Sequence, residues 1–198
     1  QPVASSGLVV AAYGRRGILE SAGNRMGYIT KGRKLRVVCG DRVQFQTPET
    51  SEDVLVTATE PRTNVLVRVA QHGTGTEPVA ANITQILVVC APCPAPDWFL
   101  VDRYICAAEL MDCRAVIVWN KADLGDPDDT FGGEYPGLGY PVLTASARNR
   151  AGTGELAAHM AAGTSVLVGQ SGVGKSSLIN VLAPGAEAAI GALSASGA

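Results

Sequence analysis

The sequence has little that would place it outside the ordinary globular proteins. It contains no apolar run close to the ~18 residues that a membrane-spanning helix needs. Its first residues do not combine a basic region with a long apolar stretch, so no signal peptide is predicted. Only 5% of its 198 residues are aromatic and 17% are charged. We expect a cytoplasmic protein without membrane contacts, and we expect it to be a monomer. Because the first residue is Gln1 rather than Met, we also expect processing or a fragment.

Cysteine and histidine are too few and too scattered to predict a metal centre. The five cysteines stand at positions 39, 90, 93, 106 and 113. Cys90 and Cys93 form a C-x-x-C pair, but a zinc site needs four ligands and no second pair lies nearby. We interpret the pair as reduced and structural. His72 and His159 are isolated, and neither is assigned any chemistry.

Charge is unevenly distributed along the chain, although the net charge is only −2. Residues 1–47 hold eight basic and two acidic residues, a net charge of +6, and the remainder holds eight basic and sixteen acidic residues, a net charge of −8. A basic first part before an acidic second part suggests two modules, the first of which binds a polyanion. A basic surface that is merely solvated remains the alternative.

The first part reads as a small β-barrel of the oligonucleotide-binding type. Short apolar segments separated by glycines predict strands at 7–12, 17–21, 35–39, 43–46 and 54–59. Such strands, joined by basic connections, suit a small barrel over residues 1–70. The cations that could reach phosphates from a loop or strand edge are Lys31, Arg33, Lys34 and Arg36. A segment rich in Gly and Thr then predicts a linker at 71–79.

The second part, 80–198, alternates between apolar strands and helical periodicity. Strands are predicted at 86–90, 114–119, 142–145 and 165–168, and helices at 97–112, 154–162 and 174–182. In the first helix, one stripe carries Trp98, Val101, Ile105, Ala108 and Met111. Alternating strands and helices predict a parallel sheet covered on both faces. The segment 126–139, with its acids, glycines and prolines, is predicted to be a surface loop.

A phosphate-binding loop follows the last predicted strand. The sequence from Gly169 to Ser176 fits G-x-x-x-x-G-K-S and lies between a strand and a helix, as that motif requires. Its glycines allow backbone N–H groups to converge on phosphates at a helix N-terminus. Lys175, the candidate catalytic residue, would reach the β- and γ-phosphates, and the Ser176 hydroxyl would bind Mg²⁺. The full set of candidate phosphate-binding residues is Gly169, Gln170, Ser171, Gly172, Val173, Gly174, Lys175, Ser176 and Ser177.

Two further boxes predict that the bound base is guanine. Asn120, Lys121 and Asp123 form N-K-x-D after a predicted strand. The Asp123 carboxylate can accept from both N1–H and the N2 amino group of guanine, whereas adenine would leave it unpaired and desolvated. Asn120 would support the loop and the base edge, and the Lys121 stem would lie along the ring. Ser146 and Ala147, one strand later, would offer the Ala147 N–H to guanine O6.

The order of these boxes is unusual. All three fall at strand ends facing one side of the sheet, where open α/β folds bind ligands. Ordinary small GTPases place the phosphate loop first, but here the base-reading boxes at 120 and 146 precede the phosphate loop at 169. A sheet can keep its shape when the chain is reconnected between neighbouring ends, as in circular permutation. We therefore predict a circularly permuted P-loop GTPase domain.

Taken together, these segments resemble the bacterial ribosome-small-subunit-dependent GTPase A family, which consists of circularly permuted GTPases. The resemblance covers essentially the whole chain and is carried by residues 40–43, 62–68, 80–85, 100–104, 120–124 and 165–180. It implies a GTPase that assists late maturation of the small ribosomal subunit and is stimulated by that subunit. It also implies GTP/GDP with Mg²⁺ in the site, and contact between the basic barrel and ribosomal RNA.

The chain departs from this family after the phosphate-loop helix. Residues 184–198 are almost entirely Ala, Gly and Ser. The family continues into a switch segment whose Thr binds Mg²⁺, a D-x-P-G box and a C-terminal zinc-binding domain, so Zn²⁺ is expected only in a domain not present here. We expect that these 198 residues belong to a longer, truncated protein.

Two other interpretations remain open. A non-catalytic fragment that binds guanine nucleotide or RNA would fit the missing switch segments. An ATP-using P-loop kinase would leave N-K-x-D followed by Ser-Ala unexplained.

Overall fold

The computed structural model describes residues 5–32, 34–48, 51–70, 75–127, 130–161 and 163–184. The chain divides into two compact units, Gln1–Ile83 and Thr84–Ala198, and each is described by itself. None of the helices in the described ranges has the length and apolar character of a membrane span.

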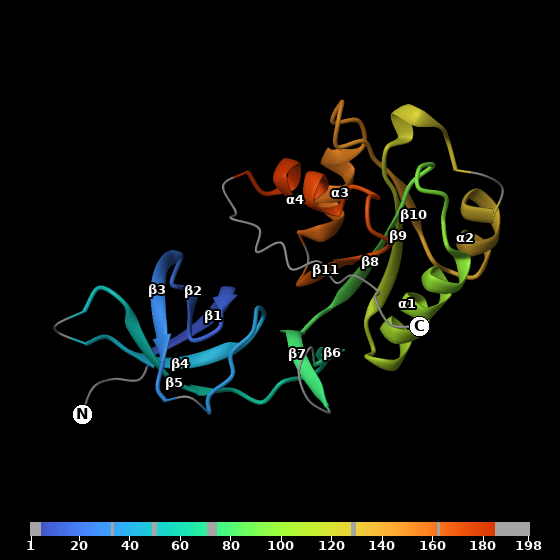
Figure 1. Ribbon diagram of the computed structural model, residues 1–198. Helices are drawn as coiled ribbons and strands as arrows, with labels where there is room; N and C mark the ends of the chain where they lie inside the picture. Colours follow the sequence, from blue (N-terminus) through green and yellow to red (C-terminus); the bar gives the residue numbers. More distant parts are fainter. Residues whose placement is uncertain are drawn as a thin grey trace. The chain divides into compact units, whose positions relative to one another are not determined.

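The first unit contains a closed five-stranded barrel with the strand order β1-β2-β3-β5-β4 (Figure 1). The predicted small barrel is thus confirmed. β1–β2–β3 form an antiparallel meander, β3 pairs in parallel with β5, and β1 closes the barrel against β4. The bounds are β1 Ser5–Tyr13, β2 Arg16–Ser21, β3 Asn24–Thr30, β4 Arg42–Gln46 and β5 Val54–Thr59.

Alternating side chains fill the barrel, as expected when one face of each strand is buried. The core consists of Val9, Leu19, Tyr28, Val37, Val43, Phe45, Val54 and Val56. Gly17 makes room for the largest of these, because a Cβ at that position would collide with the Tyr28 ring and with the Ala11 carbonyl.

Two sequence predictions in the barrel were wrong. β3 was missed, because Asn24 and Arg25 begin it and Gly27 interrupts it, so the segment has little apolar alternation. The strand predicted at 35–39 does not form. Its Val38 N–H donates to the Asp41 side chain, and only Cys39 makes an isolated bridge, to Ala80.

A hairpin of β6 (Val65–Val69) and β7 (Thr76–Ala81) completes the first unit. Residues 71–74 of the expected linker lie outside the described residues, and β7 occupies the following positions. The Ala81 N–H donates to the Cys39 carbonyl oxygen over 2.9 Å, which joins the hairpin to the barrel.

The second unit is a four-stranded parallel sheet with the order β10-β9-β8-β11, as predicted from the alternating pattern. Its strands are β8 Gln85–Cys90, β9 Arg114–Trp119, β10 Val142–Thr144 and β11 Ser165–Val168. Its helices are α1 Trp98–Leu110, α2 Tyr135–Gly137, α3 Thr153–Met160 and α4 Lys175–Leu182, with the short helices η1 Ala122–Leu124 and η2 Thr130–Glu134.

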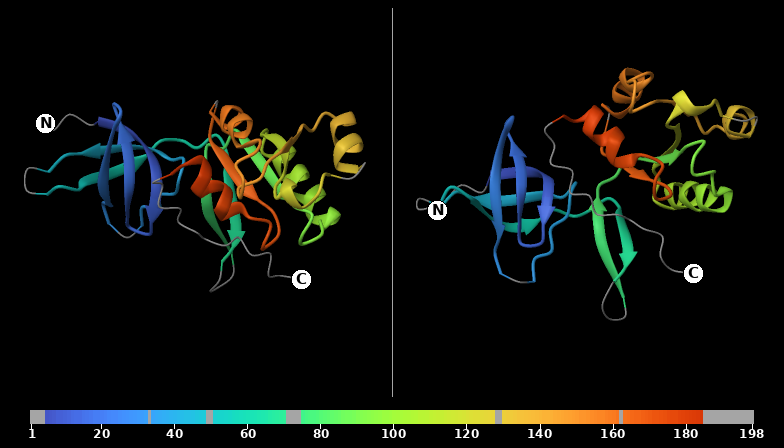
Figure 2. Two further views of the ribbon diagram at one scale, coloured as in Figure 1. Left: turned by 90° about the horizontal axis from the view of Figure 1, so that it is seen from above. Right: turned by 45° about the horizontal axis from the view of Figure 1, so that its top comes forward.

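Helices cover both faces of this sheet (Figure 2). Leu87, Val89, Val116 and Val118 pack with Leu156 of α3 and Leu178 of α4. Since side chains alternate along a strand, the intervening residues of β8 and β9 face α1, whose buried residues are Val101, Ile105 and Ala108.

The segment predicted as a surface loop, 126–139, is partly buried, so that prediction was wrong. Phe131 in η2 has no exposed surface, and Tyr135 in α2 is 8% exposed. The polar composition of this segment concealed two aromatic residues spaced four apart, a spacing that places both on one face of a helical turn.

Candidate nucleotide-binding site and basic barrel segment

The predicted phosphate loop leaves the sheet at the carboxyl end of β11 and enters α4. Gly169 and Gly174 have φ angles of +137° and +92°, which favour glycine. A Cβ at Gly169 would collide with the Val89 carbonyl oxygen, and one at Gly174 would collide with the Asn120 side-chain amide. Only glycine therefore fits at either end of this loop.

The start of α4 provides donors for an anion. Gly174 is its N-cap and has no side chain to occupy the first-turn N–H groups, and the first turn carries no acidic residue. These N–H groups have no acceptor within the helix, and the helix dipole favours negative charge here. The Ser176 side chain lies in this first turn and is half-buried.

Lys175 lies across the loop. Its Nζ donates to the carbonyl oxygens of Gly169 (2.8 Å) and Gln170 (2.7 Å). Burial disfavours the ammonium form and lowers the pKa of Lys175 below its ordinary value. The amine is thus held beside the loop that would surround the phosphates.

The N-K-x-D box begins where β9 ends and is tied to the phosphate loop. Asn120 is 1% exposed, and its Nδ2 donates to the Val173 carbonyl oxygen over 2.8 Å. Lys121 has a left-handed backbone, with φ +59°, and its Nζ donates to the carbonyl oxygens of Cys93 and Gly172, each over 2.7 Å. The two boxes therefore form one connected structure.

The Ser-Ala pair completes the group at the end of β10. The Ser146 hydroxyl, which is buried, donates to Asp123 Oδ1 over 2.6 Å. The Ala147 N–H donates to Asn120 Oδ1 over 3.2 Å. The structure thus brings together Asn120, Asp123, Ser146 and Ala147, four of the five positions predicted to contact guanine.

Sequence reasoning missed two contacts at this edge of the sheet. Arg148 Nη1 lies 3.7 Å from Asp123 Oδ2, although the Arg148 side chain is 82% exposed and such a pair contributes little. The Gln170 side-chain oxygen accepts from the Asp97 N–H over 3.1 Å, which joins the phosphate loop to the start of α1. A cation two positions after Ser146 was the only available signal for the Arg148 pair.

The Ser176 hydroxyl is the predicted magnesium ligand at this site. Among the described residues, no group of three or more His, Cys, Asp or Glu could hold a metal. Mg²⁺ usually keeps several waters and takes few protein ligands besides the phosphates, so a single hydroxyl such as that of Ser176 suits it.

The C-x-x-C pair consists of two free thiols. Cys90 is buried and Cys93 is exposed, and burial raises the pKa of Cys90 to about 12.

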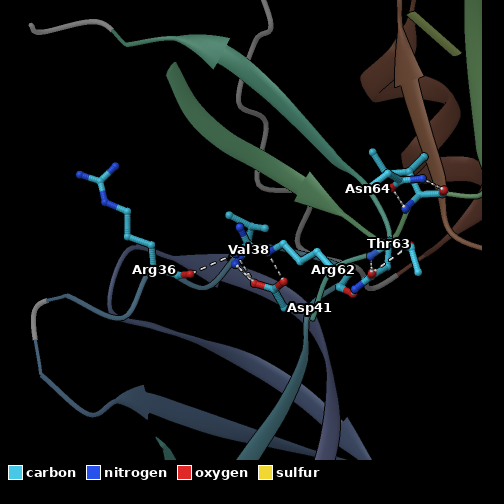
Figure 3. A network of polar contacts seen from close by, with 9 residues as sticks. Arg36, Val38, Asp41, Arg62, Thr63 and Asn64 are labelled. Atoms are coloured by element: carbon cyan, nitrogen blue, oxygen red, sulfur yellow. Dashed lines mark hydrogen bonds and ion pairs between the residues drawn. The ribbon is translucent and has the colours of Figure 1, made fainter. Parts of the chain in front are cut away.

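The predicted RNA-contact residues in the barrel are spread along the connection after β3. Lys31, Lys34 and Arg36 are exposed, and Arg33 lies outside the described residues. In Figure 3 the Arg36 side chain extends away from the polar network, while its backbone belongs to it. The Arg36 carbonyl oxygen accepts from Arg62 Nη2 over 3.1 Å.

A buried carboxylate organises this network. Asp41 has no exposed surface, and it accepts from Arg62 Nε (2.7 Å), Arg62 Nη2 (2.9 Å) and the Val38 N–H (2.9 Å). This hydrogen bonding to Asp41 raises the pKa of Arg62. The Asn82 side chain extends the network by donating to the Gly40 carbonyl oxygen and accepting from the Thr63 N–H. The basic connection therefore ends in a turn held by hydrogen bonds to Asp41, Arg62 and Asn82.

A closed barrel, followed by a parallel sheet whose base-reading boxes precede its phosphate loop, defines a circularly permuted P-loop GTPase fold. Solved structures agree. YjeQ from Thermotoga maritima superposes with a TM-score of 0.72 at 30% identity, covering 92% of this chain and 66% of that protein. YloQ, described as a circularly permuted GTPase, gives 0.68 at 26% identity, covering 90% and 64%.

The RsgA GTPase family model matches residues 59–198, and the chain belongs to this family. A relative from Alcanivorax borkumensis, named small ribosomal subunit biogenesis GTPase RsgA, is 42% identical over 81% of this chain and 47% of the relative. The protein of the same name from Azotobacter vinelandii is 41% identical over 96% of this chain and 57% of the relative. The chain thus spans about half the length of the curated relatives it matches.

Proposed function

We propose that this chain binds GTP and GDP at the carboxyl edge of its parallel sheet and acts as a GTPase in biogenesis of the small ribosomal subunit. The observation that carries the proposal is the bonded assembly of N-K-x-D, Ser-Ala and the phosphate loop in one place. The names of the relatives supply the process, and they favour this enzymatic interpretation over a non-catalytic fragment.

For the base, we propose that Asp123 accepts from N1–H and the N2 amino group of guanine. The hydrogen bond from Ser146 orients the carboxylate, and the Lys121 stem lies along the ring. Asn120 supports both the loop and the base edge. Ala147 would donate to guanine O6, sharing or giving up its 3.2 Å bond to Asn120.

For the phosphates, we propose that the backbone N–H groups of 169–177 surround the β- and γ-phosphates. Lys175 would exchange its two carbonyl acceptors for phosphate oxygens, which carry full negative charge and bind an ammonium more strongly. Ser176 would hold Mg²⁺, which supplies charge neutralisation on the phosphates when bound.

For the barrel, we propose contact with the ribosomal RNA of the small subunit. The residues that would make this contact are Lys31, Arg33, Lys34 and Arg36. The support is the exposure of the three described cations and the bonded turn that follows them. We further propose a monomer in the cytoplasm.

The test is GTP turnover by the protein with and without purified small ribosomal subunits, beside Lys175→Ala. We expect binding of fluorescent GDP, and phosphate release that rises with subunit concentration and is lost in the variant. GDP binding without phosphate release at any subunit concentration would support the non-catalytic interpretation instead. Displacement of GDP by ATP as effective as by GTP would contradict the assignment of the base.

A further inference from the structure

Trp119 is the last residue of β9 and stands directly before the turn that carries Asp123. Its indole Nε1 donates to the Gly125 carbonyl oxygen over 2.9 Å. Within the turn, the Leu124 N–H donates to the Lys121 carbonyl oxygen over 2.8 Å. The indole therefore bonds the far end of the base-reading turn back to the strand from which the turn departs.

The indole ring belongs to an aromatic cluster, which we define as Trp98, Trp119, Phe131 and Tyr135. Trp119 is 4% exposed and meets Phe131 at a centroid distance of 4.8 Å and an angle of 52°. Phe131 stacks on Trp98 at 4.4 Å and lies 5.9 Å from Tyr135. Phe131 of η2 therefore contacts the indole directly, and Trp98 of α1 and Tyr135 of α2 pack in turn on Phe131.

The turn needs such support because its backbone is not in a relaxed conformation. Lys121 has a left-handed φ of +59°, which costs free energy for a residue with a side chain and persists only where the surroundings over-determine it. Asn120 and Lys121 hold the start of the turn against the phosphate loop. The Trp119–Gly125 bond holds its end, and Asp123 lies between the two.

We propose that Trp119 is a positioning residue for guanine recognition, acting through the backbone of the turn that carries Asp123. The inference rests on the proposed function of this site as a guanine-nucleotide site. The Ser146 hydroxyl donates to the Asp123 carboxylate, and the Trp119 indole bonds the backbone of Gly125, two residues further along the same turn. Together they set the direction in which the carboxylate meets the base.

The test compares GDP with IDP, because hypoxanthine keeps N1–H but lacks the N2 amino group of guanine. In Trp119→Phe the ring remains and the N–H donor is lost. We expect GDP affinity to fall about 3- to 10-fold, as for loss of one hydrogen bond. IDP, which makes only one bond to Asp123, should be weakened less. The ratio of GDP to IDP affinity therefore falls, whereas general damage to the phosphate loop would weaken both nucleotides equally.

Two variants serve as controls. Tyr135→Phe removes the 2.8 Å hydrogen bond from the Tyr135 hydroxyl to Asp102 but leaves the Trp119–Gly125 bond, so the ratio should not change. Phe131→Leu keeps the indole N–H but loosens its packing, so the ratio should fall less than in Trp119→Phe. Phe131→Leu also provides the test if Trp119→Phe fails to fold, as judged by circular dichroism.

An unchanged ratio in a folded Trp119→Phe that still binds GDP would overturn the role of Trp119 alone. Unmodified protein that binds neither GDP nor IDP would overturn the proposed function and, with it, this inference.

Discussion

At the scale of single residues, Asp123 is the group on which the proposed choice of base depends. Its Oδ1 already accepts from Ser146, and its side chain is 16% exposed. A carboxylate in this position has only acceptors to offer. A base that presents two adjacent donors satisfies it, and a base that presents an acceptor leaves it desolvated and unpaired.

We predict that Asp123→Asn exchanges guanine for xanthine, whose C2 carries an oxygen in place of the amino group. The amide N–H can donate to that oxygen, whereas it repels the guanine amino group. GDP affinity should fall roughly 10- to 100-fold, the range for loss of a charged hydrogen bond, while XDP affinity rises. Competition of both nucleotides against fluorescent GDP or XDP measures the exchange. Asp126→Asn, an exposed acid just beyond the turn, is the control and should leave both affinities unchanged.

At the scale of elements, the turn before β4 depends on a charge pair rather than on strand pairing. Asp41 is buried, and the Arg62 side chain, 26% exposed, meets it with two nitrogens. Removing one partner of a buried pair leaves an uncompensated charge, which is far more costly than losing an exposed pair. The turn that ends the basic connection should therefore lose its structure when Arg62 is replaced.

We predict that Arg62→Ala destabilises the protein by about 3 kcal/mol. Arg68→Ala, which removes a half-exposed pair with Glu77 at 3.3 Å, should cost about 1 kcal/mol or less. Urea unfolding of both variants, followed by far-ultraviolet circular dichroism, compares the two losses directly. Similar losses in the two variants would show that the Asp41–Arg62 pair adds nothing beyond a surface contact.

The elements also show where local patterns were insufficient. The strands of the parallel sheet were predictable because β8 and β9 are buried and nearly continuous apolar runs. β3 was not, because it is a half-buried strand whose polar start and internal Gly27 weaken the alternation. Phe131 and Tyr135 were hidden in a polar segment, since their burial depends on Trp98 and Trp119 from distant parts of the chain.

At the scale of the whole molecule, the excess of positive charge is concentrated in residues 1–47, within the first unit, and the rest of the chain carries an excess of negative charge. The proposed RNA contact predicts a dependence on salt, since each cation that meets a phosphate releases bound counterions. Replacing Lys31, Arg33, Lys34 and Arg36 with Gln should weaken binding to small ribosomal subunits. It should also flatten the slope of log K against log salt by about 0.7 to 0.9 for each phosphate that no longer meets a cation.

The control for that experiment is the double replacement of Arg25 and Arg68 with Gln. Both of these cations pair with a glutamate, Arg25 with Glu20 and Arg68 with Glu77, so the slope should hold. Binding is measured at several salt concentrations. Unfolding would lower the affinity at every salt concentration, whereas loss of phosphate contacts also changes the slope of log K against log salt. An unchanged slope in the fourfold variant would place the RNA contact elsewhere.

The residues of the candidate site were predictable from the sequence. Asn120 to Asp123 and Gly169 to Ser177 are short consecutive segments. The residue types that phosphate and guanine binding require therefore stand next to one another in the sequence. Their order along the chain was sufficient to predict the permutation, because parallel strands bring their carboxyl ends to one edge whatever the connection between them. Local patterns likewise predicted the barrel and the parallel sheet as fold classes, although they missed β3.

The contacts that hold these groups in place became visible only in the folded protein. The bonds from Asn120 to Val173, from Arg62 to Asp41 and from Asp97 to Gln170 each join residues 21 to 73 positions apart in the sequence. Even the short-range bond from Trp119 to Gly125 depends on rings from α1 and η2. Such contacts follow from strand register and side-chain packing, which no local pattern specifies.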